Sequence, residues 1–263
     1  MRRRGAVLLV LAATLAGCGG GGNKAGGDRI ALAAAKTAKV GSIEADFRIE
    51  GAGVDGQGTG VFNTGKKGSG QLTMTVAVNG RSVKIDTVIT GTVLYMRSPM
   101  FAQLTGGKQW VMLDLGKIAR QRGIDLGSLL NTSPTPTSAL AYLRGSGGKI
   151  DKVGEERVRG VKTTHYHTNV DLRRAASQAK GASRQSLRRV ITESGVKQIP
   201  VDVWIDGKGY VRRVAYETNS AGGRSTQVTM ELHDFGTHIP ISAPPRQSVV
   251  DLMSRLGGGG SSG

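Results

Sequence analysis

Cysteine is nearly absent from this sequence, since Cys18 is the only one among 263 residues. A single thiol excludes a disulfide within the chain and therefore a disulfide-stapled fold. Aromatic residues make up only 4% of the chain, which leaves few rings for stacking on nucleic-acid bases. Beyond residue 15, no apolar run approaches the roughly 20 residues of a membrane-spanning helix. These absences argue against helical membrane spans and against nucleic-acid binding.

The first 18 residues have the three parts of a bacterial export signal. Arg2, Arg3 and Arg4 supply a positive start, and an apolar run of about ten residues follows, AVLLVLAATL. Leu15-Ala16-Gly17-Cys18 has the pattern of a lipobox, in which a cysteine thiol takes a thioether-linked diacylglycerol. We therefore expect a signal peptide over residues 1–17, cleavage between Gly17 and Cys18, and acyl chains such as palmitate on Cys18. The alternative is a plain secretory signal with a chance cysteine near its end.

Acidic residues are also scarce, and this bears on the expected partners. The chain has 36 lysines and arginines against 19 aspartates and glutamates, for a net charge of +17. Two or three acyl chains anchor a protein stably, so we expect a lipid-anchored protein on the extracytoplasmic face of the cell membrane. Nucleic acid is not available there, and the excess charge favours anionic lipid surfaces or acidic wall polymers. We expect a monomer.

Glycine-rich segments flank the predicted folded part. Gly19 to Gly27 cannot form a core, so residues 18–29 are predicted as a flexible tether. Residues 257–263 (GGGGSSG) are predicted as a disordered tail, which leaves 30–256 for the folded domain. A third glycine-rich stretch, around Asp55, Gly56, Gly58 and Gly60, is predicted as a flexible hairpin tip.

Alternation of apolar and polar residues predicts mainly β-strands. Ile43, Ala45, Phe47 and Ile49 alternate with charged residues, as in a strand with one wet face. Asn79-Gly80 is a two-residue hairpin signal between two more alternating runs. Further strands are predicted at 92–97, 109–115, 161–170, 199–206, 210–218 and 226–234. In the 92–97 strand both Val93/Tyr95 and Leu94/Met96 are apolar, so its inward face stays open.

Helices are fewer, and they follow no strand–helix–strand alternation. They are predicted at Ile30 to Val40, Ser138 to Arg144, Leu172 to Glu193 and Ser248 to Leu256. Without such alternation a parallel sheet is not expected. The fold class is therefore α+β, with a long antiparallel sheet that is mostly a meander and helices on one of its faces.

Several segments resemble actinobacterial lipoproteins with a LolA-like fold, the group that includes LppX and LprG. The similar segments are QWVMLDL at 109–115, PTSALAYLR at 136–144, GVKTTHYH at 160–167, VDL at 170–172, PVDVWID at 200–206, and Arg212-Arg213. The resemblance implies a half-barrel, a curved antiparallel sheet wrapped around a few helices with an apolar cavity between them. These motifs are structural, so they identify a fold better than an activity.

The resemblance implies a non-enzymatic protein of the cell envelope that binds or carries a lipid or glycolipid. Apolar and aromatic side chains would line such a site. The candidate lining residues are Leu72, Met74, Val76, Leu94, Met96, Trp110 and Met112. Two alternatives stay open: the same side chains would also pack an ordinary dry core, and the same fold would serve a sensory or interaction protein that transports no ligand.

Other chemistry-bearing residues favour neither a metal site nor an enzyme. His165 and His167 project from one face of a predicted strand, and His233 and His238 bracket Asp234, but surface or partly buried histidines are the expected interpretation. The sequence has no nucleophile elbow, Walker loop or His-Glu-x-x-His motif. We therefore predict no catalytic residues, no metal and no cofactor.

One basic stretch suggests a membrane-facing helix. Its cations are Arg173, Arg174, Lys180, Arg184, Arg188 and Arg189. On a helix they would lie against an anionic bilayer, or they would form an ordinary solvated face.

Overall fold

A computed structural model of the chain describes residues 22–51, 53–64, 68–78, 80–122, 149–178, 195–219, 225–237 and 239–257, together with 136, 143, 184, 188, 191 and 192. The predicted signal peptide, Gly17 and the acylation site Cys18 lie outside these residues. So does His238. Among the described residues, no helix is long and apolar enough to cross a membrane.

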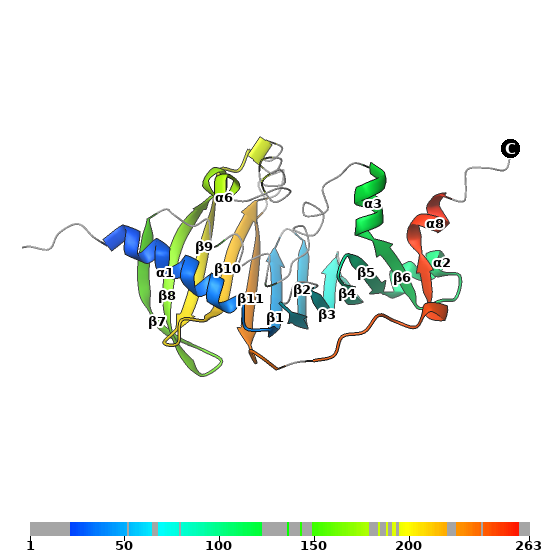
Figure 1. The fold of residues 1–263 in the computed structure, drawn as a ribbon, viewed down its shortest axis with the longest axis horizontal. Coiled ribbons are helices and arrows are strands. Elements are labelled where there is room, and N and C mark those ends of the chain that lie inside the picture. Colours follow the sequence, from blue (N-terminus) through cyan, green and yellow to red (C-terminus); the bar gives the residue numbers. More distant parts are fainter. Residues whose placement is uncertain are drawn as a thin grey trace, which may run out of the picture.

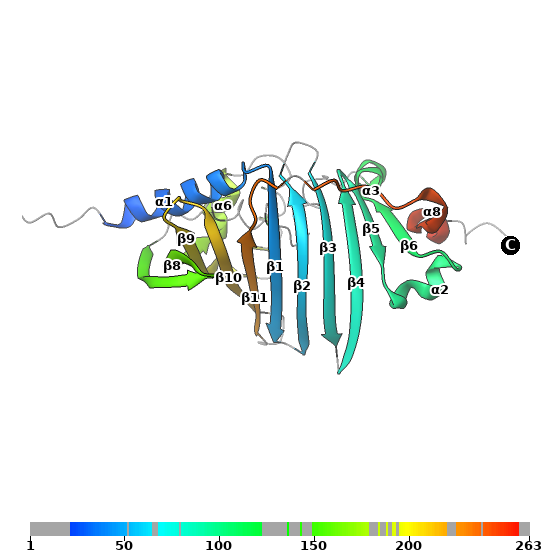
Figure 2. The same ribbon diagram turned by 90° about the horizontal axis from the view of Figure 1, so that it is seen from below.

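The described chain is built on one twelve-stranded sheet (Figure 1). From one edge to the other its strands are β12 (Val249–Asp251), β6 (Trp110–Asp114), β5 (Val93–Arg97), β4 (Arg81–Thr90), β3 (Ser69–Val78), β2 (Val54–Asn63), β1 (Ser42–Gly51), β11 (Ser225–His233), β10 (Val211–Asn219), β9 (Gln198–Asp206), β8 (Val161–Asp171) and β7 (Ile150–Val158). Every neighbouring pair is antiparallel except β12 and β6. The sheet is curved and unclosed, with β12 and β7 at opposite ends (Figures 1 and 2).

The strands form two meanders that meet at β1. Strands β2 to β6 follow one another on one side of β1, and β11 to β7 follow on the other side. The alternating segments predicted to be strands are found in this sheet, whereas β2, β7 and β12 were not predicted. Among the described residues the helical elements are fewer than the strands, and all but the first, of 16 residues, are short, so the fold is dominated by the sheet. They are α1 (Gly22–Thr37), η1 (Pro99–Phe101), α2 (Ala102–Thr105), α3 (Leu115–Arg122), α6 (Leu172–Gln178), η2 (Arg246–Ser248) and α8 (Leu252–Gly257).

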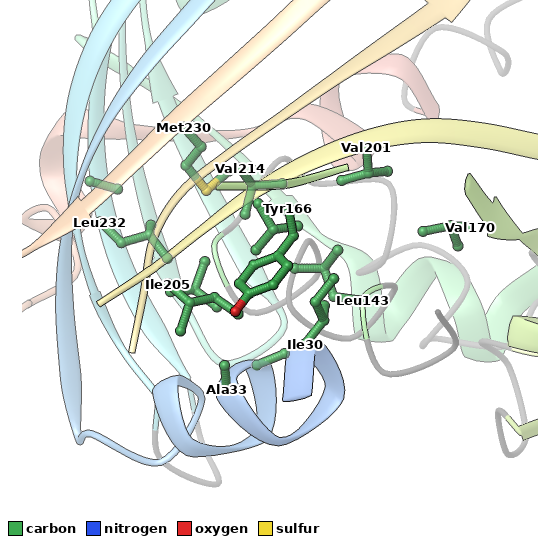
Figure 3. Packing of buried hydrophobic residues seen from close by; sticks show 14 of the residues in the cluster. Ile30, Ala33, Leu143, Tyr166, Val170, Val201, Ile205, Val214, Met230 and Leu232 are labelled. Carbon is green, nitrogen blue, oxygen red and sulfur yellow. The ribbon is translucent and has the colours of Figure 1, made fainter. Parts of the chain in front are cut away.

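The two faces of the sheet differ in what they bury. We call the face that bears Phe47, Val203 and Met230 the inner face, because paired residues project to the same side of a sheet. Helix α1 packs on it over β7, β9 and β10. Figure 3 shows Ile30 and Ala33 of α1 directed toward the sheet residues of this core. Ile30, Val203 and Leu232 are each 0% exposed.

Thr37 joins the end of α1 to the sheet. Its side chain is 0% exposed, and its hydroxyl donates to the Ala33 carbonyl at 2.8 Å. The same oxygen accepts the Val211 backbone N–H at 2.9 Å. A buried backbone donor is costly when unpaired, so this hydroxyl fixes where α1 ends against β10.

The glycine-rich stretch predicted as a hairpin tip is strand β2 instead. Gly56, Gly58 and Gly60 pair in register with Val76, Met74 and Leu72 of β3. A Cβ atom at Gly58 would lie 2.3 Å from the Thr73 carbonyl oxygen and 2.7 Å from Met74 Cγ. Gly58 and Gly60 therefore lie where neighbouring atoms approach too closely for a side chain, whereas a Cβ at Gly56 would meet its nearest atoms at an ordinary 3.5 Å. Local glycine content alone does not reveal this difference.

Helix boundaries differ from the predicted ones at both ends of the chain. Helix α1 begins at Gly22, so part of the predicted tether is helical, and it ends at Thr37 rather than Val40. A helix already fixed by its packed turns extends at low cost, even through glycines that disfavour it. The predicted C-terminal helix starts at Leu252, because Val249–Asp251 pairs with β6 as β12. Gly257 ends α8, and the rest of the predicted tail lies outside the described residues.

The two internal helices predicted from sequence fall largely outside the described residues. Of the predicted helix at 138–144 only Leu143 is described, and its side chain is buried at 1% exposure. Of the predicted helix at 172–193, the structure describes α6 and four later residues.

The chain after β11 runs along one edge of the sheet to β12 (Figures 1 and 2). Ser42 Oγ donates to the Thr237 carbonyl at 2.6 Å, and Asn63 Nδ2 donates to the Ile239 carbonyl at 3.2 Å. These contacts bind the segment to β1 and β2, so the C-terminal strand reaches the far edge of the sheet.

Candidate functional site

Five of the seven predicted lining residues share the inner face. Leu72 and Met74 pair with Thr87 and Ile85 of β4, and the pairing continues from Thr87 to Met96. The complete inner-facing set among the predicted residues is Leu72, Met74, Val76, Leu94 and Met96. This register also decides which residues of the predicted 92–97 strand face inward. Leu94 and Met96 do, whereas Val93 and Tyr95 face outward. Ile85, Ile89 and Leu113, which the sequence analysis did not select, lie on the same face.

Trp110 and Met112 lie on the outer face, so their predicted place in the lining is wrong. The register pairs Leu94 with Leu113 and Met96 with Val111, which leaves the even-numbered residues of β6 outside. Both the even-numbered and the odd-numbered residues of this strand are apolar. Hydrophobicity therefore did not predict which of them face inward. Asp114 shares the parity of Trp110 and Met112, and this charge is the sequence signal that would have oriented the strand correctly.

The inner face is filled on one side and only partly covered on the other. Val203 of β9, Val214 of β10 and Met230 of β11 are 0%, 2% and 1% exposed. On β3 and β5, by contrast, Met74 and Met96 are only half-buried. Half-exposed apolar side chains on one face are the surface that a hydrophobic ligand would cover.

A hollow of about 480 Å³ lies on the opposite, outer face over β11, β1, β2 and β3. Threonine hydroxyls and charged groups line much of it, including Thr59, Thr73, Thr229 and Glu231. Such a lining suits water or a polar ligand and not an acyl chain.

A second hollow of about 630 Å³ lies beside α1. Arg29, Leu32 and Lys36 of the helix line one side of it, and Tyr166, Ile205 and the β9–β10 turn at 206–209 line the other. Arg29 Nη1 donates to the Tyr166 hydroxyl at 3.0 Å, and Lys36 Nζ donates to the Lys208 carbonyl at 2.6 Å. More than a hundred positions separate the residues of α1 from those of the other wall, so no local sequence pattern predicts that they are close.

Asp206 contributes an acidic side chain to this hollow, but its negative charge is balanced by an arginine and by backbone N–H donors. Its carboxylate accepts Arg212 Nε at 2.7 Å and the backbone N–H groups of Lys208 and Tyr210, both at 2.9 Å. The carboxylate is 2% exposed. The electrostatic character of the hollow is therefore set by its cations.

The histidine pair on β8 lies on the outer face, within a polar network. His165 lies between Glu156, at 3.0 Å from its Nδ1, and Asp202, at 2.8 Å from its Nε2. His167 Nδ1 shares the same Asp202 oxygen at 3.0 Å. The Trp204 ring stacks on His165 with centroids 4.1 Å apart, and Trp204 Nε1 donates to Glu156 at 3.0 Å. These contacts join β7, β8 and β9 on the side away from the core.

The three described histidines, His165, His167 and His233, do not converge on one point. His233 is on β11, and two strands separate β11 from the β8 histidines, a distance of roughly 14 Å at about 4.8 Å per strand. Among the described residues, Glu44, His233 and Asp234 form a group whose ligand atoms lie within 4.8 Å of one another. His233 Nδ1 is already paired with Asp234 at 2.8 Å. This pairing holds the pKa of the exposed Asp234 carboxyl below its usual value.

A second outer-face cluster joins β3 to β6. The Asp86 carboxylate accepts the Thr73 hydroxyl at 2.8 Å and Arg97 Nη2 at 2.9 Å. The Arg97 guanidinium lies 4.9 Å from the centre of the Trp110 ring. Burial alone would raise the pKa of Asp86, but the Thr73 and Arg97 contacts hold that pKa below its ordinary value.

Sequence comparison finds two Streptomyces relatives. The chain is 29% identical over 162 residues to an uncharacterized 31.2 kDa protein of Streptomyces griseus, covering 59% of this chain and 52% of that protein. It is 26% identical over 164 residues to a predicted lipoprotein of Streptomyces coelicolor, covering 61% of this chain and 48% of that protein. The chain thus spans about half the length of the curated relatives it matches. No model of a known protein family matches the chain.

Two solved structures from mycobacteria are similar in fold. LprF from Mycobacterium bovis matches with a TM-score of 0.53 and 14% identity, covering 85% of this chain and 99% of LprF. The Mycobacterium tuberculosis lipoprotein LppX matches with a TM-score of 0.49 and 14% identity, covering 82% of this chain and 96% of LppX. The resemblance to actinobacterial lipoproteins of the LolA-like group is confirmed at the level of the fold: the chain has a large, curved, unclosed sheet like that of LprF.

Proposed function

We propose that this protein is a non-enzymatic envelope lipoprotein whose half-barrel binds an amphiphile with long apolar chains, such as a lipid or glycolipid. One observation carries the proposal. Leu94, Met96 and Met74 share the inner face with the packed core, yet these side chains are only half-buried. A hydrocarbon chain lying on them would gain about 25 cal/mol for each Å² of apolar surface removed from water.

The acylated cysteine completes the proposal. The lipobox before Cys18 and the similarity to a predicted lipoprotein of Streptomyces coelicolor both support an anchor on the outer side of the cell membrane. An anchored protein with an apolar surface meets amphiphiles at high local concentration, because both are confined to the same bilayer. In the alternative, a sensory or interaction protein, the same face would contact a protein partner.

Native mass spectrometry of the full-length protein tests the proposal, with two methionines as a matched pair. Met96 faces inward on β5, whereas Met112 faces outward on the neighbouring strand β6, and both are half-buried. We expect the wild type and Met112→Gln to retain a non-covalent lipid. Met96→Gln should lose most of it, because a polar amide replaces an apolar contact.

The covalent anchor is read in the same spectra as a mass increase on Cys18. Persistent absence of non-covalent lipid from the wild type, after purification from its own membranes, would refute the binding function. Equal loss from the two methionine variants would refute the location of the site.

A further inference from the structure

We propose that the flank of α1 and the β9–β10 turn form a docking surface for the headgroups of anionic phospholipids in the membrane that holds the anchor. This surface consists of Arg29, Leu32, Lys36 and Lys208. The inference rests on the proposed acylation of Cys18 but does not depend on whether the inner face binds a ligand.

The residues of this surface lie along one stripe of α1. Positions 29, 32 and 36 are three and four residues apart, which places them on the same flank of a helix. The adjacent flank faces the core, where Ile30, Ala34 and Thr37 are each 0% exposed. Arg29, Leu32 and Lys36 therefore lie exposed at the margin of the core, where Arg29 reaches the hydroxyl of Tyr166.

An exposed leucine lies among the cations. Leu32 is 69% exposed, the largest exposure among the large hydrophobic side chains of the described residues. Apolar side chains flanked by lysine and arginine are typical of helices that lie at a bilayer interface, where the apolar group enters the acyl boundary and the cations meet the phosphates.

The surface has an excess of positive charge within the described part of the chain. Arg29 donates to a tyrosine hydroxyl and Lys36 to a backbone carbonyl, and both partners are uncharged. Asp206, the acid in the hollow, is neutralised by Arg212. Phosphate groups would supply the missing negative charge, and the hollow of about 630 Å³ offers room for a headgroup.

The position of α1 along the chain brings this surface to the membrane. Gly22, where α1 begins, is four positions after Cys18, and four residue steps span at most about 14 Å. Arg29 follows seven residues later, about 10 Å further along the helix at 1.5 Å per residue. An acylated Cys18 would therefore hold this flank of α1 within roughly one helix length of the headgroups.

Fluorescence at an introduced cysteine tests the proposal on the full-length acylated protein. Acylation occupies Cys18, so the new thiol is the one that reacts with an environment-sensitive dye. Leu32→Cys reports on the docking surface. Met100→Cys is the matched control, because Met100 is 60% exposed and lies on η1, which contacts β4 and α2, whereas α1 contacts β7, β9 and β10. The labelled proteins are reconstituted into vesicles of phosphatidylcholine, with or without phosphatidylglycerol and a lipid-borne quencher.

We expect the dye at position 32 to shift to the blue and be quenched when phosphatidylglycerol is present, while the dye at position 100 stays in water. Changing Arg29, Lys36 and Lys208 together to glutamine should reduce this quenching about tenfold, since each surface cation contributes to attraction by an anionic bilayer. Changing Arg81, Lys84 and Lys108 to glutamine removes the same charge elsewhere on the molecule and should have little effect.

Three results would overturn the proposal. The first is a dye at position 32 that stays as exposed to water as the dye at position 100. The second is quenching that does not depend on anionic lipid. The third is loss of quenching when Arg173 and Arg174 of α6 are changed instead, which would assign docking to the α6 surface. A missing mass increase on Cys18 would refute the anchor itself, whereas failure of docking with acyl chains present would leave the proposed lipid binding standing.

Discussion

The two halves of the sheet carry similar apolar residues on the same inner face but bury them differently. We call β1 and β7 to β11, with α1 and α6, the packed half, and β2 to β6 the open half. In the packed half Met230 is 1% exposed, while Met96 of the open half is half-buried. The kinds of residue on the inner face are alike in the two halves and do not account for this difference in exposure. Among the described residues, α1 and α6 pack into the core of the packed half, whereas Met74, Leu94 and Met96 of the open half stay partly exposed.

The largest expected effect compares methionine truncations in the two halves. Met230→Ala should lower the free energy of unfolding by about 2–5 kcal/mol, because it leaves a cavity in a filled core. Met96→Ala should lower the free energy of unfolding by about 1 kcal/mol, because the Met96 side chain is already partly in solvent and its removal leaves no closed cavity. Chemical denaturation of both variants measures the two costs. Equal costs would mean that the open half is an ordinary dry core, and the comparison would fail.

The glycines of β2 lie on the first strand of the open half, next to β1 of the packed half, and a second comparison tests why they are needed. Gly58→Ala would bring a methyl group within 2.3 Å of the Thr73 carbonyl oxygen, so we expect a loss of about 1–3 kcal/mol from overpacking. Gly154→Ala on β7 is the control, since a Cβ there meets no atom within 4 Å. Thermal unfolding of both variants measures the effect. A harmless Gly58→Ala would show that β2 tolerates side chains and that its glycines do not shape the sheet.

The smallest expected effect concerns the outer face of the open half, where Asp86 joins β3, β4 and β5. Its pKa is lowered from the ordinary value of 3.8 by contacts with Thr73 and Arg97 that outweigh burial. A carboxyl with a depressed folded-state pKa stabilises the fold above its ordinary pKa, and the contribution is lost as the pH falls through the folded value. Asp86→Asn should therefore lower stability by under about 1 kcal/mol near neutral pH.

The pH dependence checks the sign of this contribution. The gap in Tm between wild type and Asp86→Asn should stay constant from about pH 7 to about pH 5 and shrink below about pH 4. A gap that widens in acid would mean that the Asp86 carboxylate destabilises the folded state.

Sequence patterns revealed those parts of the fold whose signals are local. Ile43, Ala45 and Phe47 face the core as alternation predicts, and β3 pairs with β4 antiparallel, with Val78 opposite Arg81, as the hairpin signal predicts. Strand β2 was missed because three of its inward positions, Gly56, Gly58 and Gly60, are glycines and so give no apolar alternation. Its role depends on how closely β3 approaches, and that distance is a tertiary property.

The candidate site was predictable only in part, for a related reason. Leu72, Met74 and Val76 followed from the alternation of a single strand, whereas Trp110 and Met112 were misplaced on a strand that is apolar on both sides. The docking surface required residues from α1 and from a turn about 170 positions later. Residues this far apart in the sequence become neighbours only when the sheet forms, and no pattern within either segment predicts that they are close.

Photo-crosslinking tests the central claim most directly, because it maps where a bound acyl chain lies. A phospholipid or fatty acid with a photoreactive group in its chain is bound to the full-length protein, irradiated, and located by peptide mass spectrometry. The account predicts crosslinks in β3 and β5, at inner-face positions such as Met74, Leu94 and Met96. Crosslinks confined to outer-face residues such as Tyr95 and Met112, or none above the level of unfolded protein, would contradict it.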